Sequence, residues 1–175
     1  MIDTAKLGGM SALDFKINGS AVSWSFHPKH EDIVLLKLAQ PLAPGKQLTL
    51  TTPFIVKIPS GSISRLGHIG QSYQITQWYP KPAVFDHKGW HPIPYLNQGE
   101  FYSEYGSFDV SITVPKNYVV GATGVLQNAS EASFLDSLAQ DTKTRISEII
   151  ALPGGNLRDS FPPSASEWKT LRYVQ

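Results

Sequence analysis

The sequence contains no cysteine among its 175 residues. This absence excludes disulfide bonds, thiolate zinc sites and a cysteine nucleophile. It does not identify a cellular compartment, because many exported proteins also lack cysteine. The sequence also lacks an apolar run of the roughly 18–20 residues that a helix needs to cross a bilayer. We therefore expect no membrane span.

An excess of charge of one sign is absent as well. Lys and Arg together number 15, Asp and Glu number 14, and the formal net charge is +1 at pH 7. The basic residues are scattered along the chain. Proteins that bind nucleic acid usually gather basic side chains on one face. The charge pattern therefore predicts no nucleic-acid partner.

Complete catalytic motifs are missing too. His30 and Glu31 begin a His-Glu-x-x-His pattern, but Val34 occupies the position of the second zinc ligand. These residues also introduce a predicted strand, whereas the zinc motif requires a helix that places both imidazoles on one face. No nucleophile elbow, P-loop or dinucleotide-binding glycine pattern follows a predicted strand. We expect no catalytic residue and no bound metal in this chain.

A second histidine pair remains open to two interpretations. His87 and His91 stand four residues apart and lie near Asp86. Gly89 and Pro92 disfavour the helix that would place both imidazoles on one face. A surface or packing role is therefore favoured, and a zinc site is the alternative.

What the sequence does contain is period-two alternation over its first two thirds, which is typical of strands. Asn18 and Gly19 form a turn signal between two alternating runs, and Pro53 interrupts a longer strand region. Loops are expected at 59–71 and 78–105. Predicted strands occupy residues 13–17, 22–26, 33–38, 48–58, 73–77, 108–114, 118–125 and 170–174.

A different period marks the region 130–151. Its apolar residues recur near every 3.6 positions, Ser130 is a candidate helix cap, and Pro153 follows the pattern. We therefore predict one helix at 130–151 in a mainly β chain. The strands predict a curved antiparallel sheet or a sandwich, and residues 1–175 are taken as a single, incomplete domain.

Several segments together resemble the amino-terminal β-domain of family M1 zinc aminopeptidases, in a bacterial branch. The resemblance covers residues 12–125 and rests on features of that domain rather than on the zinc motif. The matching segments are Gln77-Trp78-Tyr79-Pro80, Asp86, Gly89-Trp90-His91-Pro92, Gly99-Glu100-Phe101-Tyr102, Gly106-Ser107-Phe108-Asp109, Pro59-Ser60-Gly61-Ser62, Gly67-His68-Ile69-Gly70 and Pro115 to Gly124.

The resemblance implies where a peptide substrate is bound. In family M1 a Gln-x-Glu-Pro segment at a strand end lines the substrate cleft, and its glutamate helps to hold the free α-amine. Gln77 matches the glutamine, whereas Tyr79 stands where the glutamate would be. A phenol cannot supply the charge of a carboxylate. We therefore expect Glu100 or Glu104 to supply it.

The resemblance also implies the function of the chain. It predicts a non-catalytic domain that packs on the zinc catalytic domain of the same enzyme and walls the cleft for peptide amino termini. Zinc belongs to that catalytic domain, so this chain alone is expected to be inactive. The sequence leaves the compartment unknown, although an extracytoplasmic parent enzyme is favoured.

Two other functions stay open at this point. The aromatic loop 78–105 could serve a free-standing β-sandwich that binds carbohydrate or peptide, since exposed aromatic rings stack on sugars. The chain could also be a purely structural interaction domain. If it lacks family strands ahead of Leu13, an exposed sheet edge and apolar face should make it less stable than a longer chain.

Overall fold

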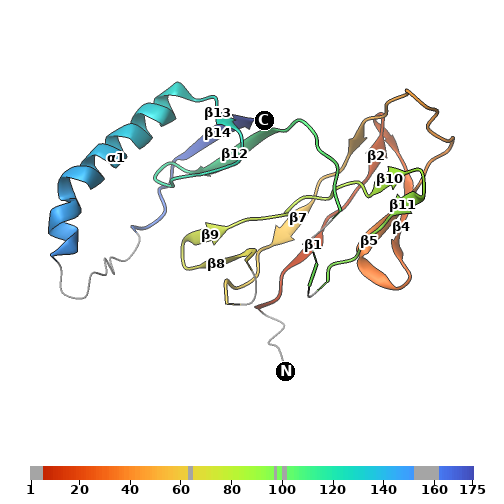
Figure 1. Cartoon of the computed structure of the whole chain (residues 1–175), viewed down its shortest axis with the longest axis horizontal. Coiled ribbons are helices and arrows are strands. Elements are labelled where there is room, and N and C mark those ends of the chain that lie inside the picture. Colours follow the sequence, from red (N-terminus) through yellow and green to blue (C-terminus); the bar gives the residue numbers. More distant parts are fainter. Residues whose placement is uncertain (1–5, 63–64, 97, 100–101, 152–161) are drawn as a thin grey trace. The chain divides into compact units, whose positions relative to one another are not determined.

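The computed structural model describes residues 6–62, 65–96, 98–99, 102–151 and 162–175. Over these residues the chain is mainly β, with several antiparallel sheets and one helix (Figure 1). The expectation of a mainly β fold with a helix near the carboxyl end is confirmed. The chain divides into two compact units, Met1–Glu104 and Tyr105–Gln175, and each is described by itself.

The first unit is built from short antiparallel strands. They form four two-stranded sheets, β1–β7, β4–β5, β8–β9 and β10–β11, and a three-stranded sheet in the order β3–β2–β6. The strands are β1 (Gly9–Ser11), β2 (Lys16–Ile17), β3 (Ser20–Ala21), β4 (Ser23–His27), β5 (His30–Lys37), β6 (Leu50–Thr51), β7 (Ile55–Lys57), β8 (Gly67–Ile69), β9 (Ser72–Gln74), β10 (Val84–Asp86) and β11 (Gly89–His91).

The turn between β2 and β3 has the geometry that its sequence predicts. Asn18 and Gly19 have φ values of 49° and 83°, and positive φ at both central residues matches the twist of a two-residue hairpin. The Asn18 Oδ1 atom accepts a hydrogen bond of 2.9 Å from the Thr49 N–H group. This bond ties the turn to the chain just before β6.

An aromatic cluster surrounds one of the buried residues of this unit. Phe15 is buried, and the centroid of its ring lies 5.4 Å from that of Trp24 in an edge-to-face arrangement. Trp24 makes a second edge-to-face contact, at 5.5 Å, with the exposed ring of Phe26. Trp24 and Phe26 occupy alternate positions of β4 and so lie on one face of that strand. Phe15, just before β2, packs its ring against Trp24.

Several predicted strands are shorter or placed differently in the structure. The region 48–58 contains two strands, β6 and β7, separated at Pro53, which cannot donate to a ladder. The predicted loop 59–71 contains β8, and the predicted loop 78–105 contains the hairpin β10–β11. Prolines and glycines around these hairpins hide the alternation, since each of their strands has only three residues.

The second unit is a three-stranded antiparallel sheet with a helix that follows its edge strand (Figure 1). The strand order is β12 (Asp109–Pro115), β14 (Trp168–Val174) and β13 (Val125–Leu126). The helix α1 spans Ala129–Ile150, one residue ahead of the prediction at each end. The predicted strand at 118–125 is wrong except at its end. Gly124 explains the close approach there, because a Cβ atom would meet the Val174 carbonyl oxygen at 2.8 Å.

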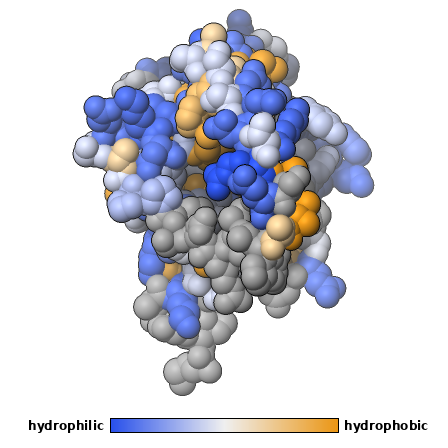
Figure 2. Space-filling model, turned by 90° about the vertical axis from the view of Figure 1, so that its left-hand side faces the viewer, coloured by the Kyte–Doolittle hydropathy of each residue, from blue (hydrophilic) through white to orange (hydrophobic). Residues whose placement is uncertain are grey.

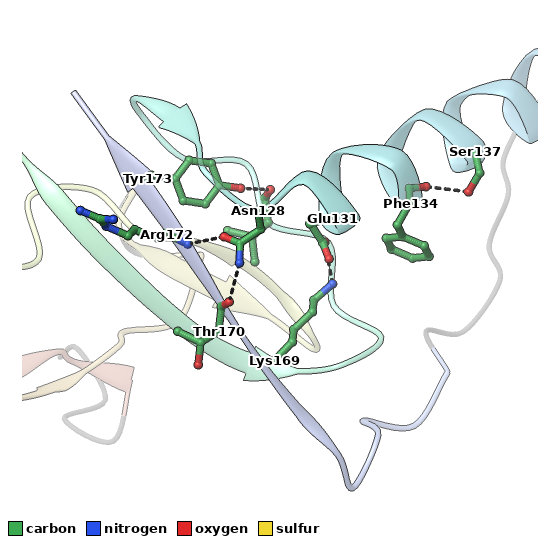
Figure 3. A network of polar contacts seen from close by, with 9 residues as sticks. Asn128, Glu131, Phe134, Ser137, Lys169, Thr170, Arg172 and Tyr173 are labelled. Atoms are coloured by element: carbon green, nitrogen blue, oxygen red, sulfur yellow. Dashed lines mark hydrogen bonds and ion pairs between the residues drawn. The ribbon is translucent and has the colours of Figure 1, made fainter.

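Asn128 joins the helix to the sheet (Figure 3). Its Oδ1 atom accepts a hydrogen bond of 2.8 Å from the Arg172 N–H, and its Nδ2 donates to the Thr170 carbonyl at 3.2 Å. The side chain thus continues the ladder that β13 makes with β14. The Asn128 carbonyl also accepts the first turn's bonds, so Asn128 rather than the predicted Ser130 precedes the helix.

The sheet face that meets α1 is apolar, with an ion pair at its border. Leu171 and Tyr173 are buried on β14, and the Tyr173 hydroxyl donates to the Val120 carbonyl at 2.9 Å. Glu131 is only 7% exposed and lies 2.6 Å from the Lys169 Nζ atom (Figure 3). Burial, together with the nearby Glu131 carboxylate, raises the pKa of the Tyr173 phenol.

Candidate functional site

The segment that resembles the family M1 motif lies just after β9. Gln77 is exposed and has φ = 50°, a left-handed conformation that is uncommon for residues other than glycine. The next residue, Trp78, lies with its ring centroid 5.9 Å from that of Phe54 and 5.7 Å from that of Tyr79. The half-buried ring of Trp78 thus contacts Phe54, just before β7, while the Gln77 side chain is exposed.

The two expected carboxylates are placed differently. Glu104 is exposed and ends the first unit, which also contains Gln77 and Tyr79. No hydrogen bond or ion pair joins Glu104 to either of those two residues in the described part of the chain. Glu100 lies outside the described residues. Its role as amine ligand stays a prediction, as does that of Glu104.

The hairpin β10–β11 holds a polar pair that motif searches alone do not find. The Asp86 Oδ1 atom lies 2.8 Å from the His91 Nε2 atom and accepts a 2.8 Å hydrogen bond from the Lys88 N–H. Both side chains of the pair are about one third exposed. The hydrogen bonds from His91 and from the Lys88 backbone lower the pKa of the Asp86 carboxyl. The sequence signal for this turn is Asp86 three residues ahead of Gly89, which has φ = 104°.

The ends of the aromatic loop are tied to one another and to β5. The Lys81 Nζ atom donates to the Ser103 hydroxyl, and the ring of His91 meets that of Tyr102 edge-to-face at 5.3 Å. The Tyr95 N–H donates to the carboxylate of Asp32 on β5. Partial burial lowers the pKa of Lys81. The loop is therefore held by its own side chains, as its aromatic content predicts.

The opposite face of this hairpin presents two aromatic rings to solvent. Phe85 and Trp90 are directly paired across the strands, with ring centroids 4.9 Å apart, and are 64% and 65% exposed. Ile55 and Ile69 in other strands are also largely exposed. On the face drawn in Figure 2, apolar side chains reach the surface in small groups between hydrophilic ones.

The histidines considered as metal ligands lie in separate places. His30 begins β5, as expected, and its ring stacks on that of His27 at 4.9 Å. His87 is exposed in the β10–β11 turn, away from the Asp86 contact that His91 makes. In the described part of the chain, no three His, Cys, Asp or Glu side chains are grouped so as to hold a metal ion. The one described helix is too polar to cross a membrane.

Comparisons with known proteins add no relative to this picture. No protein-family model, no curated protein and no solved structure matches the chain. The candidate site therefore stands on the residues of the chain and on their geometry.

Proposed function

We propose that this chain is part of the amino-terminal β-domain of a family M1 zinc aminopeptidase. In this proposal it performs no chemistry itself. It packs on the zinc catalytic domain in cis and forms one wall of the cleft that receives peptide amino termini.

The observation that carries the proposal is the backbone of Gln77. A residue other than glycine in the left-handed region costs of order 1–3 kcal/mol, and such residues gather at ligand-binding positions. Here the strained residue is the glutamine of the segment that resembles the family's Gln-x-Glu-Pro motif. The rings of Trp78 and Tyr79 contact each other beside it, and the Gln77 side chain is exposed, so its amide is accessible to a peptide backbone.

The exposed apolar side chains of the first unit support the packing role. Ile55, Ile69, Phe85 and Trp90 are each more than 60% exposed and belong to three different sheets. Large apolar side chains at the surface commonly mark places where another domain docks. A catalytic domain that covers them would give the short strands the burial that they do not reach by themselves.

The gene provides the first test. The proposal requires that the reading frame encode, downstream of Gln175, a Gly-x-Met-Glu-Asn stretch and a helix with His-Glu-x-x-His and a later glutamate. A reading frame that continues without these motifs would overturn it.

The second test addresses amine binding in the parent enzyme. Glu100→Gln and Glu104→Gln are each compared on peptides with free and with acetylated amino termini. Neutralising the carboxylate that holds the amine should lower kcat/KM for the free amine roughly tenfold or more, because a hydrogen bond to a charged group is worth about 1.5–3 kcal/mol. If both variants stay within about twofold of wild type, the domain only walls the cleft.

A second function is favoured by the Phe85–Trp90 pair alone. Two exposed rings on a hairpin can stack on a sugar or on a peptide side chain, so a free-standing binding module is the alternative. Titration of the chain with a glycan panel, monitored by tryptophan fluorescence, addresses it. Saturable binding that Trp90→Ala abolishes and Trp168→Ala leaves unchanged would favour this module over the peptidase domain.

A further inference from the structure

The outer edge of β12 carries backbone groups that point away from its own sheet. The Phe108 N–H donates to the Gln175 carbonyl at 3.0 Å, and the Gln175 N–H donates to the Phe108 carbonyl at 2.9 Å. This pair shows which residues of β12 are hydrogen-bonded to β14. Along an antiparallel strand, successive residues direct their N–H and C=O groups alternately toward one neighbouring strand and toward the opposite side. The even-numbered residues of β12 therefore bond to β14, and Asp109, Ser111 and Thr113 direct their N–H and C=O groups outward.

The two edges of this sheet are finished differently. Beyond β14, the far edge is occupied by β13, by the Gln127 N–H and by the Asn128 side chain, which bonds to Arg172 and Thr170. β12 pairs only with β14 among the described residues of this unit. The ladder contains no bulge, and no lysine lies along β12. Bulges and edge lysines are two of the devices with which proteins protect an edge strand from pairing with another chain.

We propose that this edge binds the same edge of a second copy of the chain, with antiparallel strands related by a two-fold axis at Ser111. In this register Ser111 faces Ser111 of the second copy, and Asp109 faces Thr113. Every outward N–H of β12 then meets an outward C=O, which satisfies both rows of backbone groups. The pairing joins two three-stranded sheets into one continuous sheet.

Neighbouring registers are less favourable for reasons visible in the sequence. A two-fold axis at Asp109 places two carboxylates directly opposite each other, and like charges there are destabilising. Axes at Ile112 or Thr113 place Pro115 opposite an outward residue, and proline has no N–H to donate. At Ser111 the charges are compatible, since Asp109 already holds Arg172 on its own sheet at 2.6 Å.

The side chains on both faces of β12 are compatible with a second copy of the chain as the partner. Val110, Ile112 and Val114 lie on the face that carries α1 and are half-buried in one copy. Pairing across the axis places Ile112 opposite Val110 of the second copy, so two apolar strips merge. The other face remains polar through Ser111 and through Thr113, whose hydroxyl lies 2.9 Å from that of Thr170.

Single-cysteine variants test both the association and its register, because the natural chain has no cysteine. Residues directly opposite in a hydrogen-bonded pair have Cα atoms about 5.5 Å apart, which suits a disulfide. Under mild oxidation Ser111→Cys should therefore form a covalent dimer. Thr113→Cys is the matched control, since its two copies would lie roughly 14 Å apart along the strands. We expect at least tenfold less crosslinking from it.

Sedimentation of the unmodified chain completes the test. The wild-type chain should show a concentration-dependent dimer, and Ser111→Pro, which removes an outward N–H, should reduce dimer formation at least tenfold while far-UV circular dichroism stays unchanged. Equal crosslinking at both cysteine positions would mean random collision and would overturn the proposal. So would a monomer that does not crosslink at Ser111, as expected if another segment or protein covers the edge.

Discussion

At the scale of single residues, Asn128 connects α1 to β14 through both its side chain and its backbone carbonyl. Its side-chain amide donates one hydrogen bond to β14 and accepts one from it. Its backbone carbonyl accepts the first hydrogen bonds of α1. Asparagine can do this because its amide reproduces the spacing of a backbone peptide group. One side chain thereby replaces the next residue pair of the β13–β14 ladder.

Replacing Asn128 by alanine should destabilise the second unit by about 2 kcal/mol. The substitution removes the hydrogen bonds to the Arg172 N–H and the Thr170 carbonyl, and a typical intramolecular hydrogen bond contributes about 0.5–1.5 kcal/mol net. Urea unfolding monitored by circular dichroism measures the loss. Gln127→Ala is the control, since its side chain bonds only to the nearby Val125 carbonyl. A loss no larger than that of the control would contradict this role.

Asp86 leads to a prediction on pH. Its pKa in the folded chain lies below the ordinary aspartate value of about 3.9, so its contribution to hairpin stability is fully present above that value. The contribution is lost as the pH falls through the lower folded pKa. Replacing His91 by leucine removes the first cause of the shift, and we expect the pKa of Asp86 to rise.

The measurement is a pH titration of the Asp86 carboxyl carbon by NMR. His87→Leu is a matched control, because His87 lies beside Asp86 in the β10–β11 turn and is not among the groups that lower the Asp86 pKa. An Asp86 pKa that is the same in the His91 variant and in wild type would rule out the pairing in solution.

At the scale of elements, the sequence predicts long periodic segments better than short ones. The helix and the strands at β5, β12 and β14 were predicted within a few residues, since each has at least seven residues over which a period can show. The strands β8, β10 and β11 were expected to be loop, because three-residue strands carry no period. Their pairing depends on tertiary contacts.

The candidate site was predictable to a similar degree. Gln77 and Tyr79 are candidates through a motif, and their role stays a prediction. The structure adds the ring contact between Trp78 and Tyr79 beside Gln77. The positive φ of Gln77 could not be foreseen, because asparagine and glycine, rather than glutamine, signal that conformation in a sequence. The Asp86–His91 contact required knowledge of a turn that the surrounding prolines obscure.

Among the described side chains of α1, those that are buried or half-buried lie in its first half. Leu135 and Leu138 are half-buried, whereas every residue after Leu138 whose side chain is described is exposed. We expect Leu138→Ala to cost about 1–2 kcal/mol, less than for a fully buried leucine, and Ile146→Ala to cost less than about 0.5 kcal/mol. Urea unfolding compares the two variants. Equal losses would indicate that the second half of α1 is packed as well.

At the scale of the whole molecule, the chain exposes more surface than its mass requires. Its accessible surface is 13,917 Å², against about 8,400 Å² for a compact monomer of 19.2 kDa. Among the described residues the buried hydrophobic side chains are Phe15, Val84, Leu171 and Tyr173, so each unit buries few large side chains by itself.

This surplus predicts a shallow urea transition. Because the m-value scales with the surface exposed on unfolding, it should be about seven-tenths of that of a compact protein of equal length. The native chain should also bind the apolar dye ANS, and any partner that covers the first unit should displace the dye. An m-value typical of a compact domain, with no dye binding, would contradict the prediction.

The way in which Asn128 is used has a consequence for modification. Asn128-Ala129-Ser130 is an acceptor sequence for N-linked glycans, as is Asn18-Gly19-Ser20. Attachment of a sugar replaces a hydrogen on Nδ2, and the Nδ2 of Asn128 lies between the helix and β14, bonded to Thr170. At Asn18 the Thr49 bond uses only Oδ1, which a glycan leaves in place, and the turn is exposed. Folding therefore shields one acceptor and presents the other.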